Sequence, residues 1–331
     1  MLQNRAIFLE KIEDNKKIDK KLLEDKNYLV FSFDIDVYNF LKEKKQIFEI
    51  TDEYLSQDDH LKIYQYTTSF YEWYKKNSQL KTLEFEGTNL LSLFDTAELH
   101  HLLVHEIYSF ISLKRILEKF DFKEIFANQH ISIMINSIIK NKCKIFQIES
   151  TEHNFAIPFE KYSMPVSFLG HNIPLTISRN TYKKIKSKIE SFVGKGTNLW
   201  FNPKNSKKSI LFLEFNFEQY IDLFKNLKSD KNLILVNLRH PAFSDLNSLK
   251  MLTELNCSII TPDYFLNRSE KNLATKHAKK YLINLKKLWE NQSLFSEIFT
   301  IENCSIWGTI KDILLKTYQL RLEDFVKLVL F

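Results

Sequence analysis

The fold class is decided by 209-SILFLEF-215, 232-NLILVNL-238 and 257-CSIIT-261, three apolar runs rich in β-branched and aromatic residues. The segments between them, at 217–227 and 245–255, have helical periodicity, so the region forms a β-α-β-α-β series. Strands that are apolar throughout indicate a parallel sheet covered on both faces, and right-handed crossovers place their carboxyl ends along one edge. This part of the chain is therefore predicted to be a Rossmann-like α/β unit.

A second alternation of strands and helices lies in the first 150 residues. The runs 27-NYLVFSFD-34, 123-KEIFAN-128 and 143-CKIFQI-148 are strand-like, and the last two flank a helical segment at 130–140. Short loops around that segment indicate a parallel βαβ unit. A long helical insertion with apolar periodicity occupies about 89–120. We predict an α/β protein with two Rossmann-like parallel-sheet units and helices on both faces of each sheet.

Three regions follow from this pattern. The first is an amino-terminal α/β domain at 1–150, and the second is an irregular linker and a basic helix at 151–205, where residues 151–178 hold three of the six prolines. The third is a Rossmann-like α/β domain at 206–331, helical from 272 with a break around 300–308. Because chain ends usually lie in water, the apolar end 325-FVKLVLF-331 indicates either that this end packs into a core or that the chain is truncated. Of the two, we expect a truncated chain whose last domain continues beyond it.

Composition excludes several classes of protein. The 331 residues are 44% hydrophobic, which excludes a disordered chain, and the net charge of +6 is too small to indicate a nucleic-acid binder. Cys143, Cys257 and Cys304 form no CxxC pair, so we expect reduced thiols of a cytoplasmic protein and no structural zinc. The amino terminus lacks the apolar stretch of a signal peptide, and no apolar run is long enough to span a membrane.

Polar residues follow the strands of the second unit, where open α/β sheets bind ligands. They are Glu214, Asn216, Arg239, His240 and Asp263. The helix after Asn216 presents free N–H groups suited to a phosphate, and Arg239 could hold a diphosphate in a bidentate fork. His240 could exchange a proton near neutral pH. The alternative is that Arg239 and His240 cap a loop and that Glu214 makes an ordinary ion pair.

The first unit has its own candidates at strand ends. Asp34 and Asp36 end the strand at 27–34, and Asn128 and His130 follow the strand at 123–128. We expect all four to line one crevice and to bind substrate. A DxD phosphatase would place two carboxylates in this way, but its companion motifs are not evident.

Other motifs argue against cofactors and metals. Neither GxGxxG nor GxxxxGK[ST] occurs, which argues against a dinucleotide dehydrogenase and a P-loop hydrolase, so we predict no cofactor. The helical stretch 98-ELHHLLVHE-106 lacks the HExxH order, and its leucines indicate packed histidines, so we predict no metal site. The aromatic stripe at 64–74 is interpreted as core packing, with a stacking platform for a sugar or base as the alternative.

Several stretches resemble the amino-terminal part of GT-B-type glycosyltransferase-like proteins of surface polysaccharide synthesis. They are the strand-to-helix entry with Asp34 and Asp36, then 70-FYEWY-74, 85-FEGTNL-90, 209-SILFLEFNFEQYIDLFKNL-227, 234-ILVNLRHPAF-243 and 247-NSLKMLTELNCSII-260. The resemblance implies sugar transfer from a nucleotide-activated donor to a surface-glycan acceptor without obligatory metal. In this family the activated sugar binds a carboxyl-terminal Rossmann domain, and this chain ends before any such domain.

The resemblance implies roles for the second-unit candidates. Glu214, His240 and Asp263 would act on the acceptor side as catalytic groups, and Arg239 would hold the anion. The expected partners are a nucleotide sugar and a glycan acceptor, but not nucleic acid, and peripheral contact with a membrane stays open. Two alternatives remain: a non-catalytic α/β scaffold or binding module in an assembly, and a nucleic-acid-associated protein that uses the basic helix near 179–193.

Overall fold

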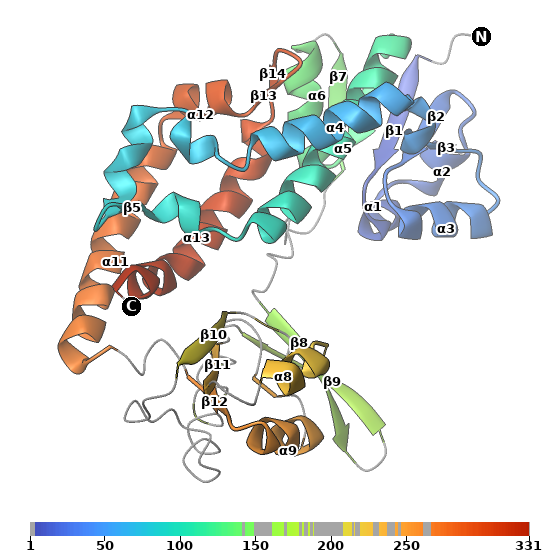
Figure 1. Ribbon diagram of the computed structural model, residues 1–331. Coiled ribbons are helices and arrows are strands. Elements are labelled where there is room, and N and C mark those ends of the chain that lie inside the picture. The colour runs from blue at the N-terminus through green and yellow to red at the C-terminus, as the bar shows by residue number, and fades with distance from the viewer. Residues whose placement is uncertain are drawn as a thin grey trace. The chain divides into compact units, whose positions relative to one another are not determined.

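The computed structural model describes residues 4–140, 143–148, 161–168, 171–178, 208–213, 219–227, 232–236, 246–260 and 266–330, together with residues 181, 185, 188, 215, 242 and 243. The chain forms two compact units, which Figure 1 shows with their elements labelled. The first unit contains residues 1–155 and 280–322, and the second contains residues 156–279 and 323–331.

The first unit is built on a five-stranded sheet in which every pairing is parallel. In sheet order the strands are β3 (Glu49–Ile50), β2 (Tyr28–Ser32), β1 (Arg5–Leu9), β6 (Glu124–Ala127) and β7 (Lys144–Gln147). The strand predictions omit β1, which is the central strand and is buried from Ala6 to Leu9. Its apolar run is only four residues long, so it is a weak signal by itself. The predicted parallel pairing of β6 with β7 is confirmed.

Six α-helices described within the first 140 residues belong to this unit. They are α1 (Ile12–Lys17), α2 (Lys20–Glu24), α3 (Ile35–Glu43), α4 (Gln57–Ser69), α5 (Thr96–Lys119) and α6 (Gln129–Ile139). Residues from β1, β2 and α3 share one buried core, in which Ile7, Val30 and Val37 are in the same cluster. The predicted helical insertion is therefore a real element, which the structure begins at Thr96 and ends at Lys119.

The carboxyl-terminal elements contribute residues 280–322 to the first unit, where they add aromatic side chains to its core. The elements are α11 (Arg268–Trp289), α12 (Gln292–Ile298), the hairpin β13 (Thr300–Ile301) and β14 (Cys304–Ser305), and α13 (Trp307–Leu330). Phe295 stacks on Trp307 with ring centroids 4.3 Å apart, and Trp73 is completely buried against Phe299. The predicted break at 300–308 is this hairpin, whose turn residues have positive φ. Residues 280–322 therefore pack with the amino-terminal unit, although the sequence placed all of 206–331 in one domain.

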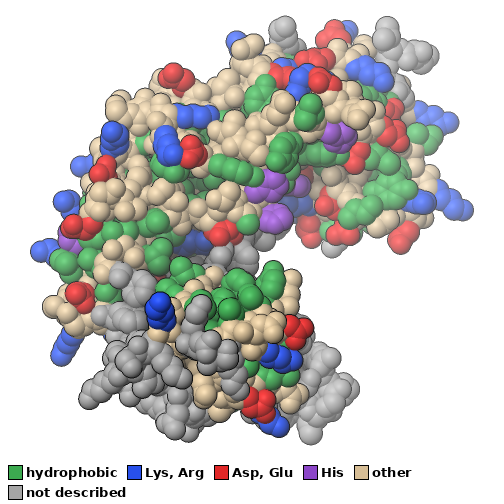
Figure 2. All heavy atoms as spheres, viewed as in Figure 1, with side chains coloured by type: hydrophobic (Ala, Val, Ile, Leu, Met, Phe, Trp, Pro, Cys, Tyr) green, Lys and Arg blue, Asp and Glu red, His purple; other side chains and the backbone are tan. Residues whose placement is uncertain are grey.

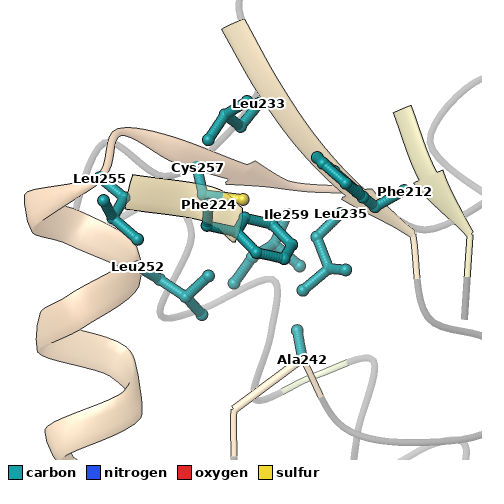
Figure 3. Packing of buried hydrophobic residues seen from close by; sticks show 9 residues of the cluster. All are labelled: Phe212, Phe224, Leu233, Leu235, Ala242, Leu252, Leu255, Cys257 and Ile259. Carbon is teal, nitrogen blue, oxygen red and sulfur yellow. The ribbon is translucent and has the colours of Figure 1, made fainter. Parts of the chain in front are cut away.

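The second unit contains the parallel sheet that the sequence predicted. Its strands are β10 (Ser209–Leu213), β11 (Asn232–Val236) and β12 (Cys257–Ile259), in that order, and α8 (Ile221–Leu227) and α9 (Leu246–Glu254) connect them. Figure 3 shows the side chains that hold these elements together, including Phe224 from α8, Leu252 from α9 and Cys257 from β12. Burial of this apolar set is the main stabilising contribution to the unit.

The segment predicted as irregular contains regular structure. Strands β8 (Lys161–Phe168) and β9 (His171–Ser178) form an antiparallel hairpin in which Pro165 is paired with Pro174. Proline donates no backbone hydrogen bond, but both strands of a two-stranded sheet are edges, where proline is tolerated. Most of the basic helix expected at 179–193 lies outside the described residues. Within the described residues, no helix is long and apolar enough to cross a membrane.

Candidate functional site

The sheet of the first unit has a topological switch point between β1 and β6. The chain winds outward from β1 through β2 to β3, and then returns to place β6 on the other side of β1 and β7 beyond it. Open α/β sheets bind ligands beyond the carboxyl ends of the strands where the winding reverses. Glu10 directly follows β1 and Asn128 directly follows β6, so both residues lie at this point.

A buried histidine joins two carboxylates there. His130 Nδ1 lies 2.7 Å from Glu10 Oε1, and His130 Nε2 lies 2.9 Å from Glu106 Oε2. Glu10 comes from the end of β1, Glu106 from the middle of α5 and His130 from the first turn of α6. An imidazolium donates from both nitrogens, so one charged histidine satisfies both carboxylates.

Asn128 and Asp14 extend this group. The Asn128 side-chain amide donates to Glu10 Oε2 at 2.7 Å and to Asp14 Oδ2 at 3.1 Å, while its oxygen accepts the Ile131 backbone N–H at 2.9 Å and caps α6. Asp14 Oδ2 also accepts the backbone N–H groups of Glu10 and Lys11. The turn that leaves β1 is thus held closed by the first residues of α1. We call Glu10, Asp14, Glu106, Asn128 and His130 the switch-point cluster.

The pKa values of the switch-point cluster show which charges it favours. Burial acts to lower the pKa of His130, but the charges of Glu106 and Glu10, and hydrogen bonds to both, overcome it and raise that pKa to about 10. Burial acts to raise the pKa of Glu10, but the charge of His130 and hydrogen bonds from His130 and Asn128 lower it to about 2. Burial raises the pKa of Asp14, and the neighbouring charge of Glu10 acts in the same direction. His130 is therefore an imidazolium at neutral pH, and Glu10 is a carboxylate.

The switch-point cluster is closed to solvent. Its five members are between 0% and 6% exposed, and Asp14 Oδ1 is buried with no hydrogen-bond partner among the described residues. The donors of His130 are used by protein carboxylates, so the arrangement fixes β1, α5 and α6 relative to one another. Its hydrogen bonds fix the backbone positions of the turn after β1 and of the start of α6, the two segments that border the switch point.

Asp34 and Asp36 are arranged differently from the prediction of a shared crevice. Both are exposed, and Asp34 caps α3 by accepting the Asp36 backbone N–H at 2.7 Å. Among the described residues, no hydrogen bond or ion pair links either aspartate to Asn128 or His130. The structure brings Asn128 and His130 together through Glu10, because β1 and β6 are neighbours.

The candidates of the second unit follow strands that share an edge. Because β10, β11 and β12 are parallel neighbours, their carboxyl ends lie at the same edge of the sheet. The segments that follow these strands in the sequence contain the five predicted site residues: Glu214, Asn216, Arg239, His240 and Asp263. All five lie outside the described residues. The structure therefore shows the edge formed by the strand ends, and the gathering of these five residues at that edge stays a prediction.

The histidines at 98–106 and the aromatic stripe at 64–74 each contain both packed and solvent-exposed side chains. A hydrogen bond of 2.7 Å joins His100 Nδ1 and the Tyr71 hydroxyl. His101 and His105 are exposed on α5, where histidine side chains are visible at the surface (Figure 2). No group of three or more metal-ligating side chains is suitably placed in the described part of the chain. Within the aromatic stripe at 64–74, Trp73 is core, whereas Tyr64 is 60% exposed.

Sequence reasoning missed Glu10, Asp14 and Glu106. The available signal was the run Ala6–Leu9 followed at once by Glu10, which is the pattern of a buried strand with a polar residue at its carboxyl end. Glu106 had no comparable signal, because a glutamate on a long helix is ordinarily solvated.

No family model, curated protein or solved structure matches this chain. Fold and site together define an α/β protein with two parallel sheets flanked by helices, and with a buried carboxylate–histidine cluster at the switch point of the larger sheet.

Proposed function

We propose that this chain is a GT-B-like glycosyltransferase component that transfers a sugar from a nucleotide-activated donor to a surface-glycan acceptor. The observation that carries the proposal is the parallel order β10-β11-β12, which puts the carboxyl ends of the three strands at one edge of a sheet. We expect Glu214, Arg239, His240 and Asp263, which follow these strands in the sequence, to lie at that edge. Phosphate-bearing ligands bind at such edges. A second parallel sheet with its own switch point supports an architecture of two α/β units.

The proposed reaction is a displacement at the anomeric carbon. The acceptor hydroxyl forms the new C–O bond, the bond between the anomeric carbon and the phosphate oxygen breaks, and the nucleotide leaves with that electron pair. Glu214, His240 or Asp263 would take the proton of the hydroxyl as general base. Arg239 and the N–H groups after Asn216 would bind the phosphate charge.

The four candidate residues of the first unit, Asp34, Asp36, Asn128 and His130, divide into two pairs with different roles in this proposal. Asp34 and Asp36 are open to solvent at the carboxyl end of β2, where they could contact an acceptor. Asn128 and His130 are buried, so they would act by holding the turn after β1 and the start of α6 in place.

Binding of nucleotide sugars to the intact protein tests the proposal. Thermal shift and isothermal titration calorimetry with uridine, guanosine, cytidine and thymidine nucleotide sugars should show stabilisation by one nucleotide class. Arg239→Ala should abolish that binding, whereas Arg268→Ala, which removes an exposed arginine at the start of α11, should leave it unchanged. A flat response to every nucleotide sugar, or equal binding by Arg239→Ala, would refute the proposal.

A non-catalytic α/β module is the second candidate, and one observation favours it. The polar groups at the switch point of the larger sheet are buried and bonded to one another, which is what a structural cluster requires. The same titrations separate the two candidates, because a module without a donor site binds no nucleotide sugar.

A further inference from the structure

Helix α11 carries exposed basic residues around one exposed apolar side chain. Its exposed lysines are Lys276, Lys279, Lys280, Lys286 and Lys287. Ile283, 57% exposed, lies three and four residues from the last four of them. Side chains at these spacings are neighbours on a helix surface. Four lysines therefore surround Ile283, and Figure 2 shows basic side chains along the edge of the molecule over α11.

Within the described part of the chain, this basic face is not neutralised by ion pairs. No acidic residue occurs between Lys271 and Trp289, and none of the five lysines forms an ion pair within the described part of the chain. One of them, Lys280, lies over the Tyr281 ring at 6.0 Å. The opposite side of the helix is anchored: Leu285 is completely buried, and the Tyr281 hydroxyl donates to the Glu84 carbonyl at 2.8 Å. The basic face is thus held outward by a packed helix.

We propose that this face of α11 docks on a membrane surface that contains anionic lipids. Lysine ammonium groups would lie at the level of the headgroup phosphates, and their methylene chains would extend beside Ile283. The Ile283 side chain would enter the boundary between headgroups and acyl chains. An anionic lipid surface attracts lysines near it by about 1 kcal/mol each. The proposal concerns a partner surface and does not depend on the nucleotide-sugar reaction.

The composition of the face favours a membrane over a nucleic acid. The four exposed cations around Ile283 are all lysines, whereas arginine, which α11 exposes only at its first residue, Arg268, is the residue suited to bidentate phosphate recognition in nucleic acids. The exposed side chain at the centre is isoleucine, which offers no hydrogen bond and no aromatic surface for a base to stack on. Leu273, 42% exposed, adds a second apolar side chain near the start of the helix.

Sedimentation of the intact 331-residue chain with lipid vesicles tests the proposal. The protein should bind vesicles of phosphatidylcholine with phosphatidylglycerol, but not vesicles of phosphatidylcholine alone, and binding should weaken with salt. Replacing Lys280, Lys286 and Lys287 together by glutamine should reduce the partition coefficient on the order of 100-fold. Ile283→Asn leaves the charge unchanged and should reduce it about 10-fold.

Matched controls separate the helix face from net charge. A variant with Lys21, Lys44 and Lys81 replaced by glutamine loses the same charge from exposed positions outside α11, and Ile47→Asn changes an isoleucine that is 82% exposed elsewhere. Both controls should bind like the wild type. Equal losses in the lysine control, equal binding to the two kinds of vesicle, or no binding to either would overturn the proposal. The proposal would also be overturned if polyuridylate RNA displaced the protein from vesicles and bound the same lysines more tightly than lipid does.

Discussion

Replacing His130 by leucine tests the role assigned to the switch-point cluster. Leucine fills a similar volume but removes both donors, so Glu10 and Glu106 stay buried without their shared cation. Removing one partner from a buried ion pair costs about 3–5 kcal/mol of unfolding free energy. The rise in the pKa of His130 from 6.5 to about 10 corresponds to about 5 kcal/mol, which is consistent in order of magnitude. A domain is stabilised by only about 5–15 kcal/mol in all, so the variant should be severely destabilised.

Tryptophan fluorescence during urea unfolding reports on the first unit, which contains His130. Trp73, Trp289 and Trp307 are buried in the first unit, and Trp200→Phe removes the remaining tryptophan of the chain. In this background, the His130→Leu transition should move to lower urea by the stated free energy. His101→Leu is the matched control, because His101 is exposed on α5, and it should change stability by less than about 0.5 kcal/mol.

The pH dependence distinguishes lost charge pairing from lost packing. A histidine whose pKa is raised on folding contributes its full stabilisation below its unfolded pKa of 6.5 and loses it as the pH rises through about 10. The difference between wild type and His130→Leu should therefore shrink across that interval. Glu106→Gln should also partly rescue His130→Leu, since it removes one unpaired buried charge. A cost below about 1 kcal/mol at pH 6, or one that does not change up to pH 10.5, would refute the ion-pair reasoning.

Three further predictions concern the rest of the fold. Arg115→Gln breaks a bidentate pair with Glu302, at 2.7 and 2.9 Å, together with two hydrogen bonds to Asp59 Oδ1, and should cost about 1–3 kcal/mol near neutral pH. Hydrogen bonding from Arg115 lowers the pKa of Glu302 to about 2, so the Glu302 part of this cost should disappear in urea titrations as the pH falls from 4.5 through 2. The Asp59 part should remain at pH 2, because despite burial the hydrogen bonds from Arg115 lower the pKa of Asp59 further still. Gly308→Ala would place a Cβ 2.9 Å from Ile133 Cγ2 and should lower the free energy of unfolding by about 1–3 kcal/mol in denaturant titrations. The loss should be smaller in an Ile133→Ala background, and equal losses in the two backgrounds would contradict the contact. Burial raises the pKa of Cys257 to about 12, so iodoacetamide should alkylate it only after unfolding, and rapid labelling of native protein would show the thiol to be accessible.

Local sequence pattern determined the secondary structure of much of this chain. The parallel series β10-α8-β11-α9-β12 and the βαβ unit β6-α6-β7 were both predictable, because strands buried on both faces are continuous apolar runs. The helical character of residues 272–331 was predictable for the same kind of reason, since helical periodicity is a local property.

Tertiary structure decided what lies at the switch point. His130 meets Glu10 across 120 residues and Glu106 across 24, and no local pattern carries information about such pairings. The central position of β1 depends on strands that come later in the chain, and residues 280–322 join the first unit only because their aromatic side chains complete its core. Periodicity reports which face of an element is buried, whereas the partner that buries it is chosen by the packing of the whole unit.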